Sequence, residues 1–398
     1  MGLKDVCSTT MVMTVAVGIM VTVVGVLIAT GSLMCSASPL PVRVSAKASH
    51  RERLAAAHLL LQESPLIDGH NDLPWNLRKF LHNKLYSFNL SSDLTQERPW
   101  RNSPFSHTDL PRLRHGKVAA QFWSVYVPCQ SQYKNSVQLL LEQIDVIKRM
   151  VAASPYETTL VTSSREILQE FKCGRVGSLL GVEGGHALAS SMGVLRAMYD
   201  LGVRYVTLTH KCHTPWAECS ESGDEVPPNA PGLTDYGKAT NGGVVMISFY
   251  DDFLTCGGPA TISNVVDHIN HVRTMAGVDH VGLGAGYDGI NSTPKGLEDT
   301  SRYPELFAEL LKDPSWSIQD LKKLAGLNIL RAMEKVEEVR DSLLLEPPAE
   351  DIIPIHDIET LWPCRYKFAN LNNNENKASS FIDTPTSHSF QGNEALNS

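Results

Sequence analysis

The chain has 398 residues, of which 42% are hydrophobic and 20% are charged, so it is long enough for one large globular domain with tails at both ends. Its formal net charge of −8 provides no basic patch, which argues against nucleic acid as a partner. Eight cysteines are too few for a disulfide scaffold at this length, although they allow a few bridges in an oxidising compartment.

The N-terminus predicts entry into the secretory pathway. A lysine precedes an apolar run over residues 11–34, and small residues follow this run, which is the layout of a signal peptide. The run also reaches the length of a bilayer span, so an uncleaved anchor in the membrane is the competing interpretation. We favour cleavage after Ala37. Both interpretations place the remaining chain in the lumen, at the cell surface or outside the cell, where Asn89 and Asn291 are candidate glycosylation sites.

The middle of the chain predicts an α/β fold with a parallel sheet. A capped helix begins at Ser49, and short β-branched runs then alternate with helical patterns, as in βαβ units. We expect strands at 66–69, 119–127, 177–182, 205–209, 244–250 and 280–283, and helices that include 136–153, 164–171, 192–201, 262–276 and 318–339. Chain length and polar residues at the strand ends favour a TIM-like (β/α)8 barrel over an open doubly wound sheet.

The strand count falls short of a closed barrel. Six strand patterns are present, whereas a barrel of this type needs eight. Residues 232–238 read as the start of a helix, yet a new strand pattern already begins at Asn241. We therefore expect two βα units to be missing between Lys238 and Asn241. Two overlooked weak strands are the alternative explanation.

Three parts are expected along the chain. Residues 1–37 form the signal or anchor segment, and residues 38–346 form the incomplete barrel. Residues 347–398 lose the helical period and are polar, which predicts a disordered tail. The usual apolar signal for a C-terminal lipid anchor is not present in this tail.

Polar residues that follow the predicted strands form the candidate site. His70 and Asp72 follow the first strand with one residue between them, so they can share a face at the barrel mouth. An imidazole and a carboxylate are ligands that suit zinc. Glu183 leaves an apolar strand into glycines, where an unpaired carboxylate would be costly, and it can serve as a third ligand. A salt-bridged structural glutamate is the alternative.

Two further residues occupy strand ends. His210 ends the fourth predicted strand, where a histidine can orient a substrate carbonyl or hold a negative group. A hydrogen-bonded histidine that supports the loop is the alternative. Asp288 follows the last predicted strand and is the only carboxylate there, at a position where barrel hydrolases often carry an acid–base group.

Taken together, these motifs resemble the membrane (renal) dipeptidases, zinc enzymes that hydrolyse dipeptides. The resemblance extends from about residue 59 to residue 343. The motifs that carry it are Ile-Asp-Gly-His-Asn-Asp-Leu-Pro at 67–74, Gln-Phe-Trp-Ser at 121–124, Gly-Val-Glu-Gly-Gly-His at 181–186, Thr-Leu-Thr-His at 207–210, Thr-Pro-Trp-Ala at 214–217, Gly-Leu-Thr-Asp-Tyr-Gly at 232–237 and Gly-Leu-Glu-Asp at 296–299.

The resemblance implies a role for each residue of the site. His70 and Asp72 match the ligands of one zinc ion, and Glu183 matches a carboxylate that bridges two zinc ions. His210 matches the histidine that contacts the substrate and the tetrahedral intermediate. The nucleophile in the family is a water that the metal ions make acidic.

The resemblance also implies covalent links between cysteines. Cys129 and Cys212 match a disulfide of the family. Cys364 matches a cysteine that joins two subunits in some members, which makes a disulfide-linked homodimer a candidate assembly.

The sequence departs from the family at the catalytic centre. Family members carry two more strands where this chain passes directly from Lys238 to Asn241, and those strands end in the histidines that hold the second zinc. The catalytic aspartate of the family corresponds to Gly286, whereas Asp288 matches a second, structural aspartate. We therefore expect at most one zinc ion here.

Three hypotheses for the function follow. The first is an active zinc dipeptidase in which a metal-activated water hydrolyses the peptide bond of a dipeptide. The second is a catalytically impaired or inactive family member, such as a truncated isoform or an incomplete gene model. The third, an interaction protein held by its N-terminal segment, has no motif in the sequence to support it.

Overall fold

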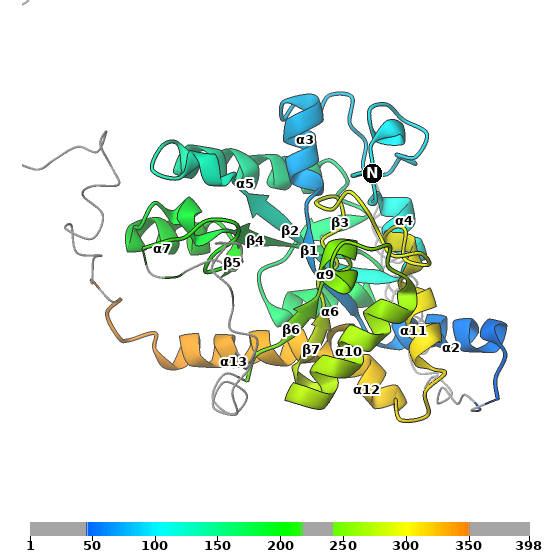
Figure 1. The fold of residues 1–398 in the computed structure, drawn as a ribbon. Helices are drawn as coiled ribbons and strands as arrows, with labels where there is room; N and C mark the ends of the chain where they lie inside the picture. The colour runs from blue at the N-terminus through cyan, green and yellow to red at the C-terminus, as the bar shows by residue number, and fades with distance from the viewer. Residues whose placement is uncertain (1–44, 46, 216, 218–241, 349, 351–398) are drawn as a thin grey trace, which may run out of the picture. The chain divides into compact units, whose positions relative to one another are not determined.

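The computed structural model describes residues 45, 47–215, 217, 242–348 and 350 (Figure 1). The predicted signal segment, the junction at residues 238–241, Cys364 and the predicted tail lie outside the described residues. Among the helices described, none combines the length and the apolar character needed to cross a membrane.

The described residues build one parallel sheet with helices packed against it. Its seven strands run in the order β3-β4-β2-β1-β7-β6, and β5 also pairs with β4. Every strand pair is parallel, so the predicted α/β class with a parallel sheet is confirmed. The strands are β1 (Leu66–Asn71), β2 (Val118–Tyr126), β3 (Thr158–Leu160), β4 (Val176–Glu183), β5 (Val203–Val206), β6 (Val245–Ile247) and β7 (Val281–Leu283).

One strand, β3, is absent from the sequence-based prediction. It spans only Thr158–Leu160, which is too short to show an alternating pattern of polar and apolar residues. The strand β5 ends at Val206, three residues earlier than expected. There the Thr207 hydroxyl, rather than a backbone carbonyl, accepts from the Gly184 amide at 2.6 Å, so a side chain replaces the next backbone bond of the ladder.

The pairing of β5 and β6 shows where the sheet ends. Both β3 and β5 lie along β4, β3 beside Val176–Ser178 and β5 beside Leu180–Val182. Within the described part of the chain, β5 pairs with β4 alone and β6 pairs with β7 alone. The two strands that bracket residues 218–241 therefore each have one partner in the described sheet, as does the short strand β3.

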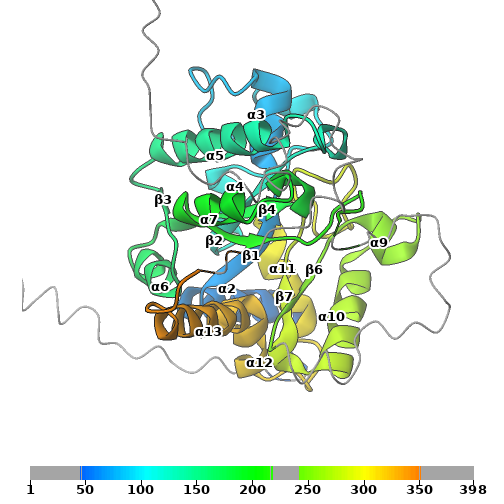
Figure 2. The same ribbon diagram turned by 90° about the vertical axis from the view of Figure 1, so that its left-hand side faces the viewer.

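The helices follow the strands as the βαβ pattern predicts, and their contacts cover the sheet. The helix α6 packs on β4 and β2, α7 packs on β5, and α10 packs on β6 and β7 (Figure 2). The helices are α2 (His50–Glu63), α3 (Leu73–Leu81), α4 (Leu110–His115), α5 (Ser136–Ala152), α6 (Ser164–Lys172), α7 (Met192–Asp200), α9 (Asp251–Thr255), α10 (Ile262–Ala276), α11 (Tyr303–Leu310), α12 (Ile318–Lys322) and α13 (Asn328–Ser342).

Two helix features have clear local causes. Ser49 caps α2 in a capping box with Glu52, which confirms the predicted start. The single helix expected over 318–339 is instead divided into α12 and α13 by a π-turn at Lys323–Leu327. Within this turn, a Cβ on Gly326 would lie 2.3 Å from the Pro65 carbonyl oxygen, so the glycine allows the turn to pack closely beside β1.

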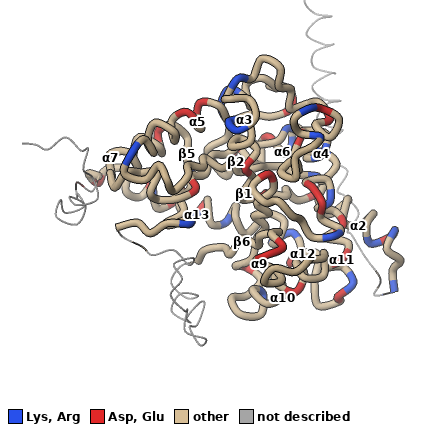
Figure 3. Tube along the Cα trace, turned by 45° about the horizontal axis from the view of Figure 1, so that its top comes forward, with Lys and Arg blue, Asp and Glu red and all other residues tan. Residues whose placement is uncertain are grey.

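Acidic and basic residues are distributed over the whole described part of the chain. Figure 3 shows basic and acidic positions interspersed along the trace rather than gathered on one face.

Candidate metal centre and active site

Three of the predicted site residues converge in the structure. His70 Nε2 lies 3.2 Å from Asp72 Oδ2 and 3.5 Å from Glu183 Oε2. One ligand atom from each residue lies within 4.8 Å of the other two, which is close enough for a single ion to contact all three. The sequence separates His70 and Glu183 by more than a hundred residues, and only the fold brings them together.

The parallel sheet explains this convergence. The strands β1, β2 and β4 are neighbours, and Glu183 at the end of β4 is level with Tyr126 at the end of β2. His70 lies at the corresponding end of β1, and Asp72 is the residue that precedes α3. The carboxyl ends of parallel strands share one edge, which is where open and closed α/β folds place their ligands.

The orientation of the His70 ring is fixed by Tyr205. The Tyr205 hydroxyl donates to the Gly69 carbonyl oxygen at 2.9 Å and lies 3.2 Å from His70 Nδ1. Because the hydroxyl hydrogen is used, the hydroxyl oxygen must accept from Nδ1–H. In the neutral imidazole, the form that binds a metal, the lone pair is therefore on Nε2, beside the two carboxylates. A Cβ on Gly181 would lie 2.0 Å from the Tyr205 ring, so the glycine makes room for this tyrosine.

Glu183 is held on both of its oxygens. Oε2 accepts from the Ser124 hydroxyl at 2.9 Å, and Oε1 lies 3.1 Å from His210 Nδ1. The His210 ring packs edge-on against Tyr126, which in turn packs edge-on against Trp75. His210 therefore lies beside Glu183 with Tyr126 and Trp75 next to it, although it stands four residues beyond the end of β5 and not at the strand end that the sequence predicts.

The electrostatics of the group favour a bound cation. Burial, followed by the nearby Glu183, raises the pKa of Asp72. Burial acts on Glu183 in the same direction, but His70 and His210 outweigh it and lower the Glu183 pKa to about 2. Burial alone would lower the pKa of His70, yet Asp72 and Glu183 raise it well above its ordinary value. Two adjacent buried carboxylates need a compensating positive charge, and one imidazole with two carboxylates is a donor set that fits a divalent ion such as zinc.

Asp68 connects this site to the neighbouring strand. It is fully buried, and its Oδ1 accepts from the backbone amides of His70 at 3.2 Å and Ala285 at 3.1 Å. The bond from Ala285 joins β1 to the segment after β7, and the bond from His70 stays within β1, next to a candidate ligand. Sequence reasoning assigned no role to Asp68, although the residue lies in the same motif as His70.

Asp288 has a different environment from that of a metal ligand. It is buried with a φ of 66°, and burial raises its pKa to about 7. Its Oδ2 accepts from the His107 amide at 3.2 Å, while Asn76 Nδ2 donates to its backbone oxygen at 2.8 Å. The adjacent Gly289 packs against Asp72, since a Cβ there would lie 2.0 Å from Asp72 Oδ2.

Gly286, which the sequence resemblance aligns with the family's catalytic aspartate, has a φ of 77°. Its amide donates to the His70 carbonyl oxygen at 3.1 Å, so its backbone runs beside β1 and close to the metal group. A Cβ on this residue would have its nearest neighbour, Ile290 Cγ2, at 3.7 Å. The position is therefore adjacent to the site and has space for a side chain.

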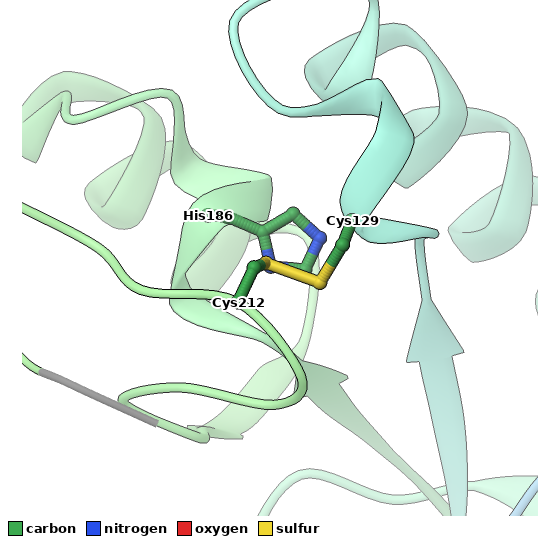
Figure 4. Close-up of side chains that lie close together, drawn as sticks. All are labelled: Cys129, His186 and Cys212. Atoms are coloured by element: carbon green, nitrogen blue, oxygen red, sulfur yellow. A yellow bond between two sulfur atoms is a disulfide. The ribbon is translucent and has the colours of Figure 1, made fainter. Parts of the chain in front are cut away.

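Cys129 and Cys212 form a disulfide, with Cα atoms 5.9 Å apart. The bridge joins the segment after β2 to the segment that carries His210, and the His186 imidazole lies against it (Figure 4). Asn89 and Asn291 are both exposed, which leaves them as candidate glycosylation sites.

Sequence reasoning missed Tyr205 and Ser124. Each lies on a predicted strand, but a strand pattern gives no information about which distant side chain a residue will meet. The alternation of inward and outward positions offered the only available signal, because it places Ser124 and Tyr126 on one face of β2.

Comparison with known proteins places the chain in a family. A sequence model described as "Membrane dipeptidase (Peptidase family M19)" matches residues 54–240 and 239–346. Dipeptidase 3 of Rattus norvegicus is 37% identical over 357 residues, which cover 74% of this chain and 70% of the relative. Dipeptidase 3 of Homo sapiens is 37% identical over 364 residues, which cover 76% and 72% of the two chains.

Solved structures support the same fold. A metallo peptidase from Rhodobacter sphaeroides, liganded with a phosphinate mimic of the dipeptide L-Ala-D-Ala, aligns with a TM-score of 0.55 and 18% identity over 68% of this chain and 99% of its own. A probable dipeptidase from Pseudomonas aeruginosa aligns with a TM-score of 0.57 and 14% identity over 72% and 99%. The family match covers most of the chain, so this protein belongs to the membrane dipeptidase family of metallopeptidases, peptidase family M19.

Proposed function

We propose that this chain is a zinc-dependent dipeptidase-family protein with a single-ion site formed by His70, Asp72 and Glu183. The observation that carries the proposal is the convergence of these three ligand atoms within 4.8 Å. Tyr205 supports it, because the tyrosine leaves the lone pair of His70 on the nitrogen that faces both carboxylates.

Each residue has a distinct task in this proposal. His70, Asp72 and Glu183 hold the ion, and Ser124 holds Glu183 in place. A bound zinc ion supplies Lewis acidity and lowers the pKa of a water molecule. His210, 3.1 Å from Glu183, is positioned to donate a hydrogen bond to the carbonyl oxygen of a dipeptide.

Dipeptides are the proposed substrate class. The Rhodobacter relative binds a phosphinate mimic of a dipeptide, and a phosphinate has the tetrahedral shape of a hydrolysis intermediate. The aromatic wall of Trp75 and Tyr126 gives this site an apolar side for a small peptide.

We further propose that the fold is the family's barrel with a segment missing. The family match falls into two pieces that meet at residues 239–240, and β5 and β6 each pair with one neighbour in the described sheet. The missing segment would carry the histidines of the second zinc in the family, and Gly286 replaces the family's catalytic aspartate. Hydrolysis by this chain should therefore be slow or absent, since both losses act on the activation of the attacking water.

Some assignments stay proposals of the sequence alone. These are the signal or anchor over residues 1–37, the barrel over residues 38–346, the tail over residues 347–398, the pairing of two subunits through Cys364, and Asp288 as an acid–base group. Because the Asp288 carboxylate bonds to the His107 amide, we favour a structural role for it.

The test measures metal and substrate separately. We expect about one zinc per chain by elemental analysis, zinc-dependent binding of a phosphinate dipeptide mimic by calorimetry, and no measurable release of amino acids from dipeptides. The His70→Ala variant should lose both zinc and binding. Two zinc ions per chain together with dipeptide turnover would contradict the single-ion site, and zinc retained by His70→Ala would place the ion elsewhere.

A further inference from the structure

A second group of metal-ligand types lies outside the proposed active site. It consists of Cys129, His186 and Cys212, whose two sulfurs and one ring nitrogen lie within 4.8 Å of one another. Cys129 begins the 3-10 turn Cys129–Ser131 after β2, and His186 lies in the 3-10 turn Gly185–Leu188 after β4. Figure 4 shows the imidazole packed against the sulfur–sulfur bond.

We propose that these three residues form a latent metal site for zinc or another thiophilic divalent ion, which becomes available when the disulfide is reduced. Cys129 and Cys212 supply two thiolates and His186 supplies a neutral imidazole. This proposal does not depend on the proposed function, because it uses none of the residues of the dipeptidase site.

The state of His186 is the main observation. The residue is 2% exposed, and its Nε2 lies 3.0 Å from the Val127 carbonyl oxygen. A carbonyl only accepts, so Nε2 carries the hydrogen and Nδ1 carries the lone pair. Among the described residues, Nδ1 is buried without a hydrogen-bond partner. A buried acceptor in this state needs an explanation, and histidine ligands of metals donate their other N–H to a backbone carbonyl in just this way.

The space around Nδ1 is kept open by a glycine. Gly184 has a φ of 96°, and a Cβ on it would lie 2.5 Å from His186 Nδ1. A larger residue would therefore cover the nitrogen that the proposed site uses.

The cysteine spacing suits both states of the site. The Cα atoms lie 5.9 Å apart in the disulfide. Two thiolates on one tetrahedral zinc ion need their sulfurs about 3.8 Å apart, given zinc–sulfur distances of about 2.3 Å. Rotation of the two cysteine side chains can open the sulfurs by this amount without a large movement of the backbone. Three protein ligands leave the fourth position of the ion to water.

The chemistry of the conversion balances. Two external thiols transfer two electrons and two protons to the disulfide, which gives the Cys129 and Cys212 thiols and one external disulfide. Binding of a divalent ion then displaces the two thiol protons, so the thiolates neutralise the charge of the ion.

A metal ion bound by Cys129, His186 and Cys212 would also hold the segments of the dipeptidase site together. Cys212 is two residues after His210, and His186 is three residues after Glu183. An ion in this site would hold the two segments that the disulfide joins, and would add the segment of His186. The site would therefore keep His210 and Glu183 in place under reducing conditions, in which the covalent bridge is lost.

The test uses the full chain with the other six cysteines replaced by serine, at positions 7, 35, 173, 219, 256 and 364. A phosphine serves as the reductant, because it becomes a phosphine oxide, with oxygen from water, and adds no competing thiol. Cobalt(II) is the probe, since thiolate ligands give it a charge-transfer absorption that carboxylate and imidazole ligands do not. We expect this absorption in the reduced protein and not in the oxidised protein, with one more cobalt per chain bound by the reduced protein than by the oxidised protein.

Two variants assign the ligands. Cys212→Ser should abolish the absorption, and His186→Asn should weaken cobalt binding at least about 10-fold. X-ray absorption of the zinc-loaded reduced protein in the His70→Ala background, which removes the other proposed zinc site, tests the histidine without any substitution at residue 186, and we expect two sulfurs and an imidazole. Absence of the absorption after reduction would overturn the proposal. Unchanged affinity in a folded His186→Asn protein, or a zinc shell without imidazole, would overturn it as well.

Discussion

The Tyr205 hydroxyl lies 3.2 Å from His70 Nδ1 while it donates its own hydrogen to the Gly69 carbonyl oxygen. The tyrosine comes from β5 and the histidine from β1, and these strands do not pair with each other. The Tyr205 side chain therefore determines which nitrogen of His70 is available to bind a metal, although it comes from a strand that does not pair with β1.

Replacement of this tyrosine should weaken the metal site without unfolding the protein. In Tyr205→Phe, the Nδ1–H of His70 loses its acceptor, so the zinc affinity should fall about 10- to 100-fold. The stability should fall by about 2 kcal/mol, because two hydrogen bonds of about 1 kcal/mol each are lost. Competition with a chelator measures the affinity. Tyr86→Phe is the matched control, because Tyr86 is fully exposed, and equal affinities in the two variants would refute the role of Tyr205.

A glycine next to the site should be intolerant of any side chain. A Cβ on Gly289 would lie 2.0 Å from Asp72 Oδ2 and 2.8 Å from its Cγ, so Gly289→Ala must displace the Asp72 carboxylate. We expect this variant to lose zinc binding while most of the fold remains. Gly193→Ala is the control, since the nearest atom to its Cβ is the Ser191 hydroxyl at 3.5 Å. Zinc binding by Gly289→Ala at the parent's affinity would show that Asp72 is not a ligand.

Two buried neighbours should give opposite pH dependences of stability. The Asp288 pKa is raised to about 7 by burial, so its contribution to stability is complete below about pH 4 and is lost as the pH rises through 7. The His107 pKa is lowered to about 4, first by burial and then by Arg112, so its contribution is complete above about pH 6.5 and is lost as the pH falls through 4. Between these limits each slope is about 1.4 kcal/mol per pH unit, and the two slopes cancel.

Substitution should expose each slope in turn. In Asp288→Asn, which resembles the protonated acid, the free energy of unfolding relative to the parent should increase by about 3 kcal/mol from pH 4 to pH 6.5. In His107→Asn, whose side-chain oxygen can replace Nδ1 as the acceptor of the Asp288 amide, the relative stability should instead increase as the pH falls. Urea unfolding across this range measures both differences. Parallel curves for the parent and both variants would mean that neither group titrates as described.

The position of the family's catalytic aspartate should accept an aspartate again. Gly286 has a φ of 77°, a region that aspartate tolerates better than most residues, and its Cβ would have no neighbour closer than 3.7 Å. We expect Gly286→Asp to fold with a loss of about 1–2 kcal/mol, and to show no dipeptide turnover because the second zinc site is still incomplete. Gly282→Asp is the control that should fail to fold, since its Cβ would lie 2.6 Å from Met246 Sδ. Turnover restored by Gly286→Asp alone would show that the aspartate was the only missing part.

Most of the elements that carry the site, and the candidates His70 and Glu183, could be predicted from the local pattern alone. Polar residues at the ends of apolar runs are visible in that pattern, and the parallel α/β class predicts that such ends share an edge. His210 was predicted in the same way, but it lies four residues beyond the end of β5. The capping box of Ser49 and the bounds of α10 are local in the same way.

The contacts that orient the ligands of the site depend on the folded chain. Tyr205 meets His70 across 135 residues, and the Ser124 bond to Glu183 spans 59 residues. The π-turn after α12 packs closely against Pro65, the residue before β1. The strand β5 ends early where the Thr207 hydroxyl accepts from the Gly184 amide. These features follow from strand register and close packing between distant segments, and a local pattern holds no information about either.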